Sequence, residues 1–132
     1  MGRFVIHARS NPPLRLLEMS DCLFCKMVAG EIKPNIVFET PKLLAFRDLH
    51  PQAPTHVLVI PKRHIATIND LNPEDAQLAG EMLLAAKTIA QQDGFAQSGY
   101  RTVMNCNADA GQSVFHIHLH VLGGRTLHWP PG

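Results

Sequence analysis

The sequence predicts an α+β domain in which a five-stranded antiparallel sheet carries one long helix and one short helix. Five short β-favouring runs indicate the strands, and a long segment with helical apolar spacing lies between the third and the fourth. Short connections between consecutive strands favour antiparallel pairing, and the long helix can then cover one face of the sheet. With 132 residues, of which 45% are apolar, we expect one domain with one core.

The first twenty residues are expected to be an extension outside this core. Residues 1–19 hold three arginines among apolar residues, but Pro12 and Pro13 interrupt any helix. A weak targeting peptide, an upstream start before Met19 and a cloning remnant all fit this segment. The predicted domain therefore covers residues 21–132.

The short helix is predicted directly after the extension. Ser20 or Asp21 can cap it, it runs to about Ala29, and Gly30 supplies a stop. The five predicted strands cover residues 36–39, 43–47, 55–60, 100–105 and 114–122. The first two form a hairpin, Pro61 ends the third, and the polar loop 106–113 joins the last two.

The long helix is predicted to begin at Asn72 and to end at Gly94. Asn72 caps it, Pro73 occupies the first turn, and the two acids that follow face the positive end of the helix dipole. One apolar stripe is expected to pack on the sheet: Ala79, Met82, Leu83, Ala86, Ile89 and Ala90.

Composition excludes several classes of function. The formal net charge is +1, so no large field favours binding to nucleic acid or to an anionic membrane. No apolar run reaches the roughly 18 to 20 residues of a membrane span, and the N-terminus lacks a signal-peptide pattern. The three cysteines cannot all pair, which favours a reducing, cytoplasmic compartment.

The most informative pattern is the alternation of His116, His118 and His120 within the last predicted strand. Alternate residues of a strand share a face, so three imidazoles are expected in a row, with neighbours about 6.6 Å apart at the backbone. Such a row is an unused polar cluster, a zinc site of a hydrolase, or a nucleophile that attacks phosphorus. Asn105, Gln112 and Ser113 precede the row with amide and hydroxyl donors, which favours phosphate binding.

Residues 116–122 match the signature of the histidine-triad (HIT) family, in which histidines alternate with apolar residues. Residues 52–56, 111–114 and 123–132 further resemble the Hint branch, whose members are phosphoramidases. The resemblance runs from about Asp21 to Gly132 and implies a HIT-like fold, with the sheet extended across a two-fold homodimer. Trp129 is then expected near the active site of the partner subunit.

The resemblance implies hydrolysis of the P–N bond of purine nucleoside 5′-phosphoramidates, such as AMP-lysine or aminoacyl-adenylate-like compounds. His118 is the expected nucleophile, which forms a nucleotidyl-histidine intermediate before water releases the monophosphate. His120 is expected to contact phosphate oxygens, and His116 to orient His118 through its backbone carbonyl. His56 matches a fourth active-site histidine, and Ser113 the residue that assists the departing amine.

Nucleotide binding is predicted from the same match. Asp48 is expected to accept hydrogen bonds from the ribose hydroxyls, and Asn105 to bind the phosphate or ribose edge. The other predicted nucleotide contacts are Phe46, Leu49, Leu23, Phe24, Met27, Gln112 and Val114. An apolar base slot discriminates weakly between purines.

Cys22 and Cys25 form a lone Cys-x-x-Cys, which is compatible with core thiols, a redox pair or half of a zinc site. The resemblance supplies two further ligands, His64 and His116, so a structural Cys2His2 zinc is expected, while the chemistry itself needs no cofactor. Two alternatives stay open for the function. They are a dinucleoside polyphosphate hydrolase of the related Fhit branch, against which the C-terminal tail argues, and a nucleotide-binding scaffold with vestigial catalysis.

Overall fold

The computed structural model describes residues 21–132. The predictions for residues 1–20, including a cap at Ser20, lie outside the described residues. Within them, no helix is both long and apolar enough to span a bilayer. The elements follow in this order: α2 (Leu23–Val28), β1 (Ile36–Glu39), β2 (Leu43–Arg47), β3 (Thr55–Pro61), η2 (Ile68–Asp70), η3 (Pro73–Asp75), α3 (Ala76–Asp93), β4 (Tyr100–Val103), η4 (Ala108–Ala110) and β5 (Leu119–Gly123).

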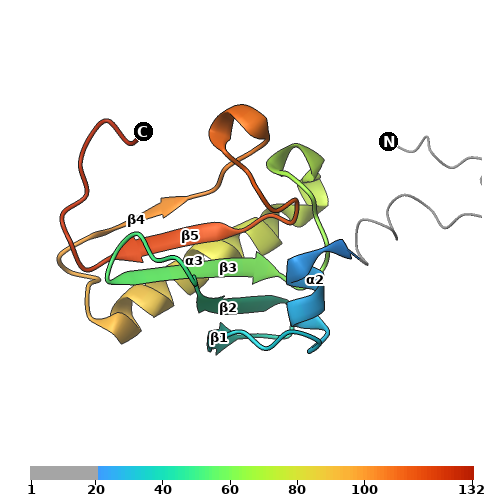
Figure 1. The fold of residues 1–132 in the computed structure, drawn as a ribbon, viewed down its shortest axis with the longest axis horizontal. Helices are drawn as coiled ribbons and strands as arrows, with labels where there is room; N and C mark the ends of the chain where they lie inside the picture. The colour runs from blue at the N-terminus through green and yellow to red at the C-terminus, as the bar shows by residue number, and fades with distance from the viewer. Residues whose placement is uncertain (1–20) are drawn as a thin grey trace, which may run out of the picture.

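The α+β class and the antiparallel sheet are confirmed. The strand order is β1-β2-β3-β5-β4, and every neighbouring pair is antiparallel. In Figure 1, α3 passes behind the sheet and α2 lies at one end of β2 and β3. The long helix therefore covers one face, as predicted, and leaves much of the other face to the short helix and to the site.

The period of two along β2 and β3 sorts their side chains between two cores. Leu43, Ala45, Val57 and Val59 belong to the core beneath α3, whereas Leu44, Phe46, Leu58 and Ile60 belong to the core beside α2. Both strands are thus buried on both faces, which makes the centre of the sheet a rigid platform.

Both helices begin differently from the prediction. Cys22 caps α2, because its Sγ accepts a hydrogen bond from the Cys25 backbone N–H at 3.3 Å. The region opened by Asn72 starts as the 3₁₀ turn η3, where the Asn72 N–H donates to the Asp75 carboxylate at 2.9 Å. Only then does α3 begin, and Gly94 ends it as predicted in the left-handed conformation, with φ of 84°.

Four of the six residues in the predicted packing stripe of α3 enter the core, whereas Ala79 is only half-buried and Leu83 is exposed. Met82, Ala86, Ile89 and Ala90 are buried, and so is Ala85, which the prediction omitted. Leu83 is 56% exposed instead, because it lies about 100° around the helix from Met82, away from the sheet.

Candidate active site

The predicted strand 114–122 is shorter in the structure, since β5 begins only at Leu119. His120 lies in β5, whereas His116 and His118 lie just before it. The alternation nevertheless persists, because Ile117, Leu119 and Val121 all enter the core beneath α3. The three histidines therefore face away from that core, as the sequence predicts.

Pro61 explains why the ladder stops before His118. A proline has no backbone N–H to donate, and the Pro61 carbonyl accepts a hydrogen bond from His116 Nε2 at 2.7 Å. The Ile117 N–H donates elsewhere, to the carbonyl of Ile65 at 2.8 Å. Side-chain and loop bonds thus replace the strand pairing that the sequence pattern implies.

His118 is held at two points. Its Nδ1 lies 2.8 Å from the His116 carbonyl, so that nitrogen carries the proton and Nε2 carries the lone pair. The Phe24 ring meets the His118 ring nearly edge-on, with centroids 5.2 Å apart. This arrangement aims an unprotonated nitrogen away from the core, as a nucleophile requires.

His56 and His120 form a second pair beside the first. His56 Nε2 lies 2.8 Å from His120 Nδ1, and the His118 and His120 ring centroids are 5.1 Å apart. A carboxylate oxygen of Asp48 lies 3.5 Å from His56 Nε2. The structure therefore brings together His56, His118, His120 and Asp48 at the start of β3 and β5.

Burial keeps these imidazoles neutral. Desolvation lowers the pKa of His118 and of His56, and it acts against the nearby Asp48 carboxylate, which raises both. The pKa of His120 falls to about 4, chiefly through desolvation and then through the neighbouring His118 and His56. A neutral imidazole is the form that can attack phosphorus.

We expect His120 to make the protein acid-sensitive. Its pKa is about 4 in the folded protein against an ordinary value of 6.5, so the unfolded chain binds more protons between these pH values. The contribution of neutral His120 to the free energy of unfolding is complete above pH 6.5 and is lost as the pH falls toward 4. At pH 5 the loss is about 1–2 kcal/mol. Urea unfolding of the wild type and of His120→Gln at neutral pH and near pH 5 measures the difference. Equal acid sensitivity of the two proteins would contradict the assignment.

The loop before the histidines is braced by Gln112, which is buried. Its Oε1 accepts from the Asn107 N–H at 2.8 Å, and its Nε2 donates to the carbonyls of Ala66 and Val114. Its backbone N–H donates to the Asn107 carbonyl. Gln112 thus uses its side-chain amide, which the sequence predicts to be a phosphate donor, to hold the loop in shape. Its contact with a nucleotide stays a prediction.

The other predicted donors sit on this braced loop. Ser113 is exposed and Asn105 is half-buried, and within residues 21–132 neither side chain forms a hydrogen bond. Val114 packs against the core beside α2. The Ser113 hydroxyl and the Asn105 amide are therefore available to a ligand.

The predicted base-pocket residues fall into two groups. Phe24 and Phe46 are each 3% exposed and stack edge-on within the core beside α2, and Met27 packs against that core. Leu23 is 42% exposed and Leu49 is 86% exposed. The two leucines therefore present apolar surface to solvent, whereas the two phenylalanines are core residues, and the base contacts of all these residues stay predictions.

A second cluster contains the four predicted zinc ligands. The ligand atoms of Cys22, Cys25, His64 and His116 all lie within 4.8 Å of one another. Cys22 Sγ is 3.4 Å from His116 Nδ1, and Cys25 Sγ is 3.2 Å from His64 Nδ1. Tetrahedral zinc with ordinary Zn–S and Zn–N bonds places such atoms about 3.5 Å apart. The cluster therefore has the dimensions of a Cys2His2 zinc site.

The two clusters share His116. Its Nδ1 faces the cysteines, its Nε2 bonds to Pro61, and its carbonyl accepts the bond from His118. A zinc ion bound there would immobilise the residue that orients the nucleophile, so its part is structural and not chemical.

Some contacts at the site were not predicted. The Pro61 carbonyl and the Gln52 backbone N–H, which donates to His56 Nδ1 at 3.0 Å, have no side-chain signal in the sequence.

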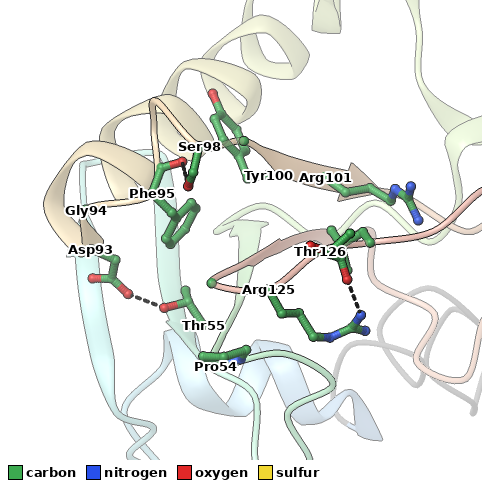
Figure 2. Close-up of a pocket in the computed structure, with 13 residues that line it drawn as sticks. Pro54, Thr55, Asp93, Gly94, Phe95, Ser98, Tyr100, Arg101, Arg125 and Thr126 are labelled. Carbon is green, nitrogen blue, oxygen red and sulfur yellow. Dashed lines mark hydrogen bonds between the residues drawn. The ribbon is translucent and has the colours of Figure 1, made fainter.

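A groove of about 720 Å³ lies away from the histidines, between the start of β3, the end of α3 and the segment after β5 (Figure 2). Arg125 lines this groove and donates to the Gln52 carbonyl.

The family model of the HIT domain matches residues 29–127. The purine nucleoside phosphoramidase of Escherichia coli is 48% identical over 107 residues, which are 81% of this chain and 90% of that protein. A HIT family hydrolase from Legionella pneumophila Philadelphia 1 has 57% identity and a TM-score of 0.83, and the alignment covers 85% of this chain and all (100%) of that one. A Zn-bound histidine triad family protein from Mycobacterium smegmatis has 34% identity and a TM-score of 0.70, with coverage of 81% and 77%.

The fold and the family model define the class, and the chain belongs to the HIT family. It is a hydrolase of that family, and its sequence is similar to that of the bacterial purine nucleoside phosphoramidase over most of both chains. The resemblance to the Hint branch and the HIT-like fold are therefore confirmed.

Proposed function

We propose that this protein hydrolyses the P–N bond of purine nucleoside 5′-phosphoramidates. The observation that carries the proposal is the His118 ring, whose Nδ1 is tied to the His116 carbonyl so that Nε2 is free to attack. The 48% identity to a purine nucleoside phosphoramidase supports the same substrate class.

The reaction proceeds in two balanced steps. His118 Nε2 attacks the α-phosphorus, the P–N bond breaks, and the amine leaves with a proton that Ser113 helps to deliver from solvent. Water then attacks the nucleotidyl-histidine, the bond from phosphorus to Nε2 breaks, and the nucleoside monophosphate departs. His120 stabilises the phosphate oxygens throughout.

Recognition of the nucleoside is assigned to residues around the histidines. Asp48 receives the ribose hydroxyls, Asn105 holds the phosphate or ribose edge, and Leu23, Met27 and Leu49 contact the base. The Asp48 side chain is 20% exposed. Its Oδ1 accepts from the His50 backbone N–H at 2.8 Å and its Oδ2 lies 3.5 Å from His56 Nε2, so a ribose hydroxyl would use the remaining lone pairs of the carboxylate. Apolar contacts to the base give weak selectivity between adenine and guanine.

We also propose a structural zinc ion held by Cys22, Cys25, His64 and His116. The spacing of the four ligand atoms supports it, as does the Zn-bound histidine triad family protein from Mycobacterium smegmatis, a structural relative. Bound zinc would fix the position of His116, and His118 would remain the nucleophile. We place the protein in the cytoplasm, because zinc ligands must be reduced thiols and the cytoplasm keeps thiols reduced. Blocking free thiols during isolation should show that Cys22 and Cys25 are reduced.

A homodimer is the proposed assembly. β4 lies at the edge of the sheet, where its outer N–H and C=O groups can pair with the same strand of a second copy. Trp129 is 80% exposed, so it is free to approach the site of the partner subunit. Sedimentation should give twice the chain mass, and a monomer at micromolar concentration would contradict the assembly.

Two other functions need to be separated from this one. A dinucleoside polyphosphate hydrolase needs the same nucleophile, whereas a nucleotide-binding scaffold needs Asp48 and the base contacts but no turnover. We expect release of AMP from an adenosine phosphoramidate to exceed that from diadenosine polyphosphates by at least about 10-fold in kcat/KM. A reversed ratio would favour the polyphosphate hydrolase, and AMP binding without any turnover would favour the scaffold.

A further inference from the structure

Arg125 is connected to the catalytic histidines although it lines a separate groove (Figure 2). Its Nε and Nη2 both donate to the Gln52 carbonyl, at 3.0 and 2.9 Å, and its Nη1 donates to the Thr126 carbonyl at 2.9 Å. Such a two-pronged bond fixes the position of the acceptor better than a single bond does. Gln52 is held further through its side chain, which donates to the His50 carbonyl at 3.1 Å.

The anchored Gln52 determines where His56 carries its proton. The Gln52 backbone N–H can only donate, and it lies 3.0 Å from His56 Nδ1. That nitrogen must therefore present its lone pair, and the proton of the neutral His56 ring sits on Nε2. The His56 side chain is 5% exposed, so solvent offers few competing partners.

The same reasoning passes to His120. His56 Nε2 carries the proton and lies 2.8 Å from His120 Nδ1, so His120 accepts there and carries its own proton on Nε2. Asp48 is 3.5 Å from His56 Nε2 and is therefore a weaker partner for that proton. The outward nitrogen of His120 becomes a donor.

We propose that Arg125 and the Gln52 backbone are a positioning unit that holds His56 in its Nε2–H tautomer and so presents the Nε2–H of His120 to an anionic phosphoryl oxygen. The second half of this statement rests on the proposed function. Arg125 and Gln52 touch no reacting atom, so both act through the histidines. In this arrangement His120 stabilises charge and does not act as a base.

The tautomers are measurable without substrate. Two-bond ¹H–¹⁵N spectra of ¹⁵N-histidine-labelled protein near neutral pH should show Nδ1 unprotonated in both His56 and His120. Arg125→Gln should mix the tautomers of both rings and lower kcat for an adenosine phosphoramidate about 10-fold or more, with KM changing less. Arg101→Gln is the matched control for the spectra, since Arg101 lines the same groove but donates only to the tail carbonyl of His128, and its spectra should be unchanged.

The possible outcomes distinguish failure of the positioning unit, called the relay below, from failure of the proposed function. A proton on Nδ1 of His56 or His120 in the wild type would overturn the proposal, and so would wild-type tautomers in Arg125→Gln. The predicted tautomers in a protein that cleaves no phosphoramidate would leave the relay standing and remove the proposed function. Should Arg125→Gln fail to fold, His56→Gln, which keeps a donor for His120, is compared with His56→Phe, which removes it. Only the second should mix the His120 tautomers, and identical His120 spectra would reject the relay.

Discussion

Replacing His118 with Gly is expected to lower AMP release from an adenosine phosphoramidate by at least about 10³-fold. The substitution removes the Nε2 lone pair that the His116 carbonyl aims, and within residues 21–132 the other clustered imidazoles are turned to different partners. Rapid-quench turnover together with intact-mass detection of the nucleotidylated chain measures both the rate and the intermediate. The wild type should gain the mass of one nucleotidyl group, and His118→Gly should gain none.

The control for this experiment is another histidine. His50 has an exposed side chain, and the structure uses its backbone groups but not its ring, so His50→Ala should keep near wild-type turnover. Thermal unfolding checks that His118→Gly folds, because removal of a buried ring leaves a cavity. Retained turnover in a folded His118→Gly protein would remove the covalent mechanism.

Replacing Cys25 with Ser is expected to reduce bound zinc from about one equivalent per chain to below about a tenth. It should also lower the free energy of unfolding by roughly 3 kcal/mol or more. The loss is smaller than in zinc fingers, which fold only with metal, because this chain already has two hydrophobic cores. Elemental analysis and urea unfolding measure the two quantities.

Cys106→Ser is the matched variant for zinc. Cys106 is half-buried like Cys25 but lies outside the Cys2His2 cluster. Its replacement should therefore leave the zinc content unchanged and the free energy of unfolding within about 0.5 kcal/mol of the wild type. Less than about half an equivalent of zinc in the wild type would argue against a structural site. Equal zinc content in the two cysteine variants would argue against this set of ligands.

The coarse fold was predictable because each element depends on local patterns. Short β-favouring runs identified all five strands, and the spacing of Met82, Ala86, Ile89 and Ala90 identified the buried face of α3. The errors lie at element ends, where hydrogen bonds to distant residues compete with local preference. The late start of β5 is of this kind. The start of α2 differs for a local reason, since the Cys22 thiol accepts from the Cys25 N–H three residues on.

The candidate site was predictable in its members more than in its geometry. The alternation of His116, His118 and His120 placed the three rings on one side of the chain, and this holds even where the strand does not form. Phe24 and Phe46 are both buried, because residues on α2 and β2 share a core whose existence only packing reveals, and their contact with a base stays a prediction.

The sequence by itself determined the fold class, through short-range periodicity, and the family, through the motif that holds the three histidines, and it predicts His118 as the nucleophile. Only the tertiary structure decided which ring nitrogens of His56, His116 and His118 face a backbone donor or acceptor. That choice depends on backbone groups of Pro61, His116 and Gln52, which the fold brings to the rings from other segments. A backbone N–H or C=O is the same in every residue, so its partner is set by position in space and leaves no mark in the sequence.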